Sequence, residues 1–255
     1  MSVVVLCSAH GAPGVTTSAL ALAWVWPAAR PGRRVLLVDG DPAGSGLLTG
    51  YLSGGVPRDA GVSILAAGRP PLSADQLVGC CVALDADATR MVLPGVLDPV
   101  QARPLAPMWG SLLSAARDLS DQGVDVLVDA GRVGHHHEPR VLVTEADLVA
   151  VVVRGDVSSV APSAAAVRAL MAERKGRHAP VALVVDASGY SSGQIRAALG
   201  VTEVLSLVRD DWTAHQFALG ATSGWRFERS PLLRAAHATA ARIADLVPER
   251  TAVTS

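Results

Sequence analysis

The sequence alternates between short runs of β-branched residues and longer stretches with helical spacing, and this alternation limits the fold more than any other feature. Most of the short runs are continuously apolar, which is typical of strands buried on both faces of a parallel sheet. Helices between such strands cover both faces. The sequence therefore predicts an α/β fold with a doubly wound, mostly parallel sheet and helices on both faces. We expect strands at 2–7, 34–39, 90–95, 124–129, 147–153, 180–186 and 202–208, and helices at 16–28, 105–121, 158–174, 191–199, 213–220 and 231–246.

The length and composition favour one large domain. A chain of 255 residues can bury a substantial core. We expect a single domain over 1–248 and a frayed tail over 249–255. Residues 53–75 are rich in Gly, Pro, Ser and Asp, so we expect a surface connection there, with one short element at 61–67.

Charge and cysteine content argue for a cytoplasmic protein. The net charge of −1 gives no general attraction to nucleic acid or to anionic lipid. No basic segment precedes an apolar core near residue 1, so we expect no signal peptide. The uncharged stretch 11–29 contains two prolines and is interpreted as a loop and a buried helix rather than a membrane span. Cys7, Cys80 and Cys81 are odd in number and two are adjacent, which favours a reducing compartment.

Three glycine-rich or acidic motifs directly follow expected strands. They are SAHGAPGVTT at 8–17, VDGDPAGSG at 38–46 and VDAGRVG at 128–134. Open α/β sheets bind ligands at the carboxyl ends of their strands. A glycine-rich turn at the start of a helix presents backbone N–H groups that attract phosphate. Together with an acidic turn and a strand-end aspartate, it outlines a nucleotide-hydrolysing site.

The chain resembles the ParA/MinD family of deviant Walker P-loop ATPases over nearly its whole length. The family's loop reads KGGVGKTT, its second motif reads VDxDPQ, and its third is a strand-end Asp followed by small residues. The segments at 90–102, 145–170 and 230–246 also resemble family segments. The similarity leans toward the divergent branch found beside Tad-type pilus and septum-site genes. It implies a P-loop NTPase fold, and ATP and magnesium as cofactors.

The resemblance assigns roles in the loop and shows what is missing. Gly11 and Gly14 match the family glycines, and Thr17 matches the threonine that helps hold the α-phosphate. His10 stands where the family has its signature lysine, which reaches the partner's phosphates across a dimer. Val15 stands in place of the Walker lysine.

The acidic residues match the family more closely. Thr16 and Asp129 correspond to the magnesium-ligating threonine and the Walker B aspartate. Asp39 and Asp41 correspond to the acidic pair near the magnesium and the attacking water, with Asp41 as the candidate that positions the water. Asp186 stands where the family often has an asparagine that contacts adenine.

Loss of both lysines affects catalysis more than binding. A lost charge-assisted hydrogen bond costs roughly 1.5–3 kcal/mol. One missing donor to a transition-state charge costs on the order of 10²–10³ in rate. His10 can compensate only when protonated, which is a minority form of imidazole at neutral pH.

Three interpretations of the loop stay open at this point: a turn without ligand, weak nucleotide binding with little or no hydrolysis, and a working ATPase in which an arginine such as Arg132 or Arg154 replaces the missing cation. We expect the second, in a ParA/MinD-like cytosolic positioning or assembly factor that is a homodimer and has a protein partner. The alternatives are a slow ATPase with nucleotide-dependent dimerisation and a nucleotide-free scaffold.

Two further features favour a solvated surface. The HHHE run at 135–138 lacks the spacing of a zinc site and is expected to be a solvated loop. Four arginines lie within 226–242, near the end of the chain where ParA proteins bind DNA, but interspersed acidic residues make non-specific DNA binding the less favoured interpretation.

MinD proteins end in a basic amphipathic membrane helix. Here Pro248 and ERTAVTS follow instead, so we expect no membrane helix.

Overall fold

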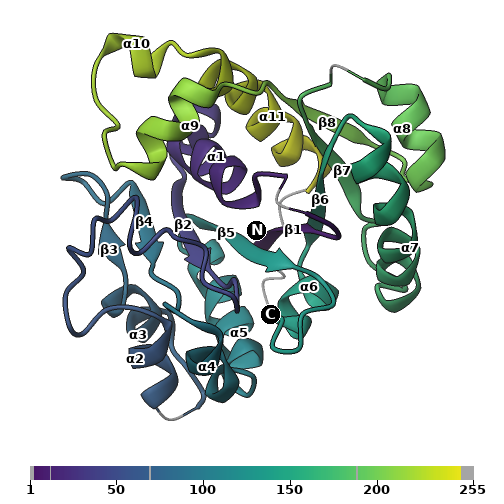
Figure 1. The fold of residues 1–255 in the computed structure, drawn as a ribbon. Coiled ribbons are helices and arrows are strands. Elements are labelled where there is room, and N and C mark those ends of the chain that lie inside the picture. Colours follow the sequence, from purple (N-terminus) through teal and green to yellow (C-terminus); the bar gives the residue numbers. More distant parts are fainter. Residues whose placement is uncertain (1–2, 12, 69, 188, 248–255) are drawn as a thin grey trace.

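The computed structural model describes residues 3–11, 13–68, 70–187 and 189–247, so the tail expected at 249–255 lies outside the described residues. An eight-stranded sheet forms its centre, in the order β3-β4-β2-β5-β1-β6-β7-β8 (Figure 1). Every neighbouring pair is parallel except the edge pair β3–β4. The expected doubly wound, mostly parallel sheet is confirmed.

The expected strands are all present, with ends that differ by at most three residues. The short antiparallel strand β3 was not expected, because two residues carry no periodicity. The strands are β1 (Val3–Ser8), β2 (Arg34–Asp39), β3 (Val82–Ala83), β4 (Arg90–Leu93), β5 (Val124–Arg132), β6 (Leu148–Arg154), β7 (Val181–Val185) and β8 (Val204–Leu207).

The six expected helices are also present, and several short helices accompany them. The short element expected at 61–67 is the helix α2. The helices are α1 (Val15–Ala29), α2 (Val62–Ala67), α3 (Ala74–Gly79), α4 (Pro99–Ala102), the 3-10 helix η1 (Arg103–Leu105), α5 (Met108–Asp121), α6 (Arg140–Glu145), α7 (Val157–Glu173), α8 (Ser192–Leu199), α9 (Asp211–Ala218), α10 (Trp225–Glu228) and α11 (Pro231–Leu246). Among the described residues, none of these helices is both long and apolar enough to cross a membrane.

The sheet separates two apolar cores, which explains the continuous apolar runs. Along β1, Val3 and Val5 pack into one core while Val4 and Leu6 pack into the other. The first core is covered by α5, α6, α7 and α8, and the second by α1, α9 and α11 (Figure 1). Because side chains alternate across a strand, a strand covered on both faces needs apolar residues at every position.

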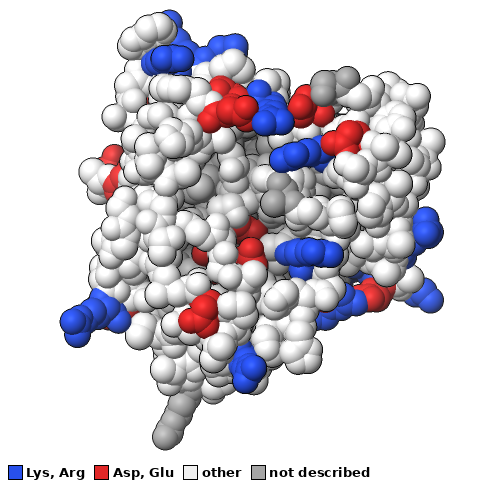
Figure 2. Space-filling model, viewed as in Figure 1, with Lys and Arg blue, Asp and Glu red and all other residues white. Residues whose placement is uncertain are grey.

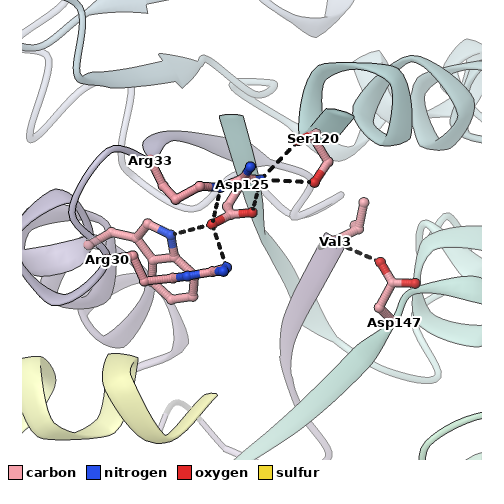
Figure 3. Close-up of polar contacts among 7 residues, drawn as sticks. Val3, Arg30, Arg33, Ser120, Asp125 and Asp147 are labelled. Carbon is pink, nitrogen blue, oxygen red and sulfur yellow. Dashed lines mark hydrogen bonds and ion pairs between the residues drawn. The ribbon is translucent and has the colours of Figure 1, made fainter. Parts of the chain in front are cut away.

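A buried ion cluster fixes the end of the sheet opposite to the three motifs. Asp125, near the start of β5, is fully buried. Its carboxylate accepts hydrogen bonds from Trp26 Nε1 at 3.0 Å, from Arg30 at 2.8 Å and from Arg33 at 2.6 Å (Figure 3). Trp26 lies in the last turns of α1, so this carboxylate anchors the helix whose other end carries the glycine-rich loop.

Candidate functional site

The glycine-rich loop connects β1 to α1, and two of its described residues lie in the left-handed region. Gly11 has φ +65° and Gly14 has φ +99°. These positive φ values favour glycine. A Cβ at either position would meet no atom within 4 Å, so the loop surface is open at these two residues. The first backbone bond of α1 runs from the Ser18 N–H to the Gly14 carbonyl at 2.9 Å. The N–H groups of the first turn therefore stay outside the helical ladder, which is the arrangement that attracts anions.

The loop carries no lysine, and the valine that replaces it points inward. Val15 is 8% exposed and belongs to the core beneath α1. His10 is exposed, on the outer side of the loop. The position that the resemblance aligns with the Walker lysine therefore carries an uncharged, buried side chain.

Two buried carboxylates lie side by side below the start of α1. Asp39 is the last residue of β2, and it is paired in register with Asp129 of the neighbouring strand β5. The Thr16 hydroxyl donates to Asp129 Oδ2 at 2.6 Å, and the Ser45 hydroxyl donates to Asp39 Oδ2 at 2.7 Å. The sheet thus brings together three of the residues that the family resemblance associates with magnesium.

Burial changes the protonation of both carboxylates. Burial, and then the charge of Asp129, raises the pKa of Asp39 to about 8. Burial also raises the pKa of Asp129 to about 6, although hydrogen bonds from Thr16 and Gly131 oppose that shift. Both groups are difficult to ionise together unless a cation approaches them.

Asp41 completes the acidic group on the turn after β2. Its N–H lies 3.4 Å from Asp39 Oδ1, and its own Oδ1 accepts a hydrogen bond from the Ala43 N–H at 2.8 Å. A Cβ at Gly131 would lie 2.4 Å from Asp41 Cγ, so the Asp41 carboxylate lies directly against the end of β5, the strand that carries Asp129. Figure 2 shows acidic side chains recessed near the middle of the face in view, where the surface is hollowed.

The small residues that make room for these carboxylates were not predicted from the sequence. A Cβ at Gly95 would lie 2.4 Å from Asp39 Cγ, as one at Gly131 would from Asp41. Ser45 was also missed, although it donates to Asp39. The only sequence signal was that Ser45 and Gly95 stand among small residues after β2 and β4, and that Gly131 stands in the glycine-containing end of β5.

The residues at this site fit a magnesium nucleotide better than a free metal ion. Within the described residues, no cluster of three or more His, Cys, Asp or Glu side chains forms a preformed metal site. Magnesium is usually held by one or two carboxylates together with water and substrate phosphates. Thr16, Asp39 and Asp129 would supply the protein oxygens of such a site.

Beside the loop lies a hollow of about 160 Å³, here called the strand-end hollow. Pro13, Gly14 and Thr17 line it on the loop side, and Asp186 lines it from the end of β7. Asp186 has φ +64°, a conformation that aspartate and asparagine tolerate better than most residues. The structure thus places Asp186 and Thr17, which the resemblance associates with the nucleotide, around one hollow.

The arginines near the end of the chain are partly used in structural contacts. Arg226 stacks on the Trp212 ring at 4.2 Å, and Arg242 pairs with Glu203 at 2.9 Å. The Arg234 guanidinium donates to the Arg229 carbonyl. Three of the four arginines therefore have contacts within the chain.

No protein-family model matches the sequence, and no curated protein matches it. Solved structures do match. A ParA family ATPase from Chlorobium tepidum TLS is 14% identical with a TM-score of 0.74, covering 94% of this chain and 97% of that one. The MinD structure in the MinC:MinD cell division complex of Aquifex aeolicus is 18% identical with a TM-score of 0.71, covering 100% of this chain and 99% of that one. The septum site-determining protein MinD of Pyrococcus horikoshii OT3, complexed with Mg-ADP, is 16% identical with a TM-score of 0.64, covering 96% of each chain. The chain therefore has the ParA/MinD-like P-loop fold over its full described length.

Proposed function

We propose that this protein is a ParA/MinD-like positioning or assembly factor that binds a magnesium nucleotide weakly and hydrolyses it little or not at all. One observation carries the proposal. The first turn of α1 and the group Thr16, Asp39, Asp41 and Asp129 are kept together, whereas Val15 occupies the Walker lysine position and packs into the core.

Weak binding follows from what remains in the loop. Backbone N–H groups at a helix start attract phosphate whatever the side chains are, and buried carboxylates favour a divalent cation between them and the phosphates. Pro13 contributes no N–H to the loop. The P. horikoshii neighbour is described as a complex with Mg-ADP, which supports the same ligand class here.

Slow or absent hydrolysis follows from what the loop lacks. Phosphoryl transfer depends almost entirely on positioning and on stabilising charge in the transition state. Asp41 is placed to orient a water, but the described loop has no lysine over the β- and γ-phosphates. We therefore expect a turnover lower by on the order of 10²-fold or more than a loop with its lysine would support.

A cytoplasmic homodimer with a protein partner is part of the same proposal. The A. aeolicus neighbour is described as a MinC:MinD complex, so this fold carries a partner-binding surface in that protein. The net charge of −1 supports a protein partner rather than nucleic acid.

The test is calorimetric titration with ATP, ADP and GTP, each with magnesium, together with a phosphate-release assay. We expect micromolar or weaker binding and phosphate release at background, unchanged in Asp41→Ala. Ordinary ATPase turnover that disappears in Asp41→Ala would contradict the lack of hydrolysis. If no nucleotide binds, the fold serves as a scaffold and the nucleotide part of the proposal is wrong.

A further inference from the structure

Arg154 is the last residue of β6, the strand beside β1 that leads into the glycine-rich loop. It lines the strand-end hollow together with Pro13, Gly14 and Thr17. It also lines a second hollow of about 280 Å³, here called the outer hollow, with His10, Gly11 and Pro13. Arg154 is therefore the arginine that borders the loop on both of these sides.

The guanidinium of Arg154 is available for a ligand. Its side chain is exposed and forms no hydrogen bond or ion pair within the described part of the chain. The two carboxylates that attract it are already engaged. Asp156 accepts from the Ser158 hydroxyl and the Ser159 N–H, and Asp211 accepts from Arg209 at 2.9 Å.

Arg209, the other arginine of the strand-end hollow, differs in this respect. Its Nε and one terminal nitrogen donate to both oxygens of Asp211, so its charge is matched locally. Asp186, Asp210 and Asp211 line the same hollow. Without Arg154, a phosphate there would meet mainly negative charge.

We propose that Arg154 binds the phosphate chain of the nucleotide and replaces, from the neighbouring strand, the cation that Val15 does not supply. This inference rests on the proposed nucleotide function. A guanidinium forms bidentate, charge-assisted hydrogen bonds to phosphate oxygens. The side chain borders the loop at Pro13 and Gly14, so it acts from the side of the loop rather than from its first helical turn.

The experiment compares the binding of magnesium-ADP and of adenosine to the full chain by calorimetry. Arg154→Gln should weaken magnesium-ADP by roughly 10-fold or more, the usual size of one charge-assisted contact. Adenosine binding should stay the same, because adenosine has no phosphate. Arg168→Gln, which removes an equal charge from the exposed face of α7, should leave both ligands unaffected. Unfolding temperatures check that each variant is folded.

A second variant tests whether Arg154 stands in for the missing lysine. Adding Val15→Lys to Arg154→Gln should recover most of the lost magnesium-ADP affinity.

Several results would overturn the inference. Unchanged magnesium-ADP binding in Arg154→Gln would do so, as would equal weakening of adenosine. A loss in Arg132→Gln instead would place the cation on β5. If the parent protein binds magnesium-ADP no better than adenosine, the proposed nucleotide function itself fails, which is a different outcome from a silent Arg154→Gln.

Discussion

The side chain of Val15 packs into the core at the position from which a phosphate-binding lysine would have to reach outward. Its environment is apolar, with Leu6 and Ala19 in the same core. A lysine stem can follow apolar surface and place its ammonium at the edge. A lysine in place of Val15 would therefore add a positive charge to the loop without requiring a change of fold.

Val15→Lys should strengthen binding of magnesium-ATP by roughly 10-fold or more, because it restores a charge-assisted phosphate contact. Val15→Met is the matched control, since it adds length without charge and should leave affinity within about twofold. His10→Lys should help less, because the corresponding family lysine acts across a dimer. Calorimetry measures all three. If Val15→Lys is folded and binds no better, the loop backbone is not a phosphate cradle.

The raised pKa of Asp39 has a consequence for stability. The folded state holds a proton on Asp39 up to pH of about 8, whereas an unfolded aspartate releases its proton near pH ~4. The unfolded state thus binds fewer protons between these values, so this carboxylate makes the free energy of unfolding fall as pH rises from ~4 to ~8.

Asp39→Asn should therefore be more stable than the parent protein in the absence of magnesium, by about 1 kcal/mol or more at pH 8. The difference should shrink toward pH 4. Asp87→Asn, at an exposed loop position, is the control and should show no such trend. Urea unfolding at several pH values measures the effect. A stability difference that is constant with pH would contradict it.

At the level of elements, the long buried strands and helices could be predicted and the short ones could not. The run at 148–153 is apolar throughout, and only a strand covered on both faces needs apolar side chains at every position. Helices of four to six residues, such as α4 and α6, hold hardly more than one turn. They show no periodicity, and their positions depend on packing against distant elements.

Some residues of the candidate site could likewise be predicted from the sequence, and others could not. Thr16, Asp39 and Asp129 could be proposed from motifs, because the carboxyl ends of parallel strands share one edge of a sheet. Ser45 and Gly95 could not, since their contact with Asp39 depends on how the turns after β2 and β4 fold back. Arg154 was one of two arginines considered, and only the structure shows that it borders the loop.

The contacts of Asp125 could not be predicted from the sequence either, because its partners Trp26, Arg30 and Arg33 are 92–99 positions away. Asp125→Asn should lower the free energy of unfolding by about 3 kcal/mol or more, since removing one partner of a buried ion cluster leaves the others uncompensated. Glu203→Gln, which breaks the more exposed pair with Arg242, should cost much less, because exposed ion pairs contribute little to stability. Chemical denaturation compares the two, and equal losses would show that the cluster does not anchor α1.

For the whole molecule, the lack of lysine in the glycine-rich loop affects how strongly nucleotide binding and self-association should be linked. A ligand shifts an oligomeric equilibrium only by its difference in affinity for the two states. In the family, the signature lysine makes that difference by contacting the partner's phosphates. His10 is exposed at this position and is not a lysine, so we expect ATP to gain little affinity from a second copy of the chain.

We therefore expect a homodimer whose mass, measured by light scattering after size exclusion, is the same without nucleotide, with magnesium-ADP and with magnesium-ATP. His10→Lys combined with Val15→Lys should make the dimer stronger in magnesium-ATP than in magnesium-ADP, because both missing phosphate contacts are then restored. Ser158→Lys adds one charge beside the outer hollow without placing it at a family lysine position, and should not create that dependence. A parent protein that is monomeric alone and dimeric only with magnesium-ATP would instead indicate a slow ATPase that cycles between the two states.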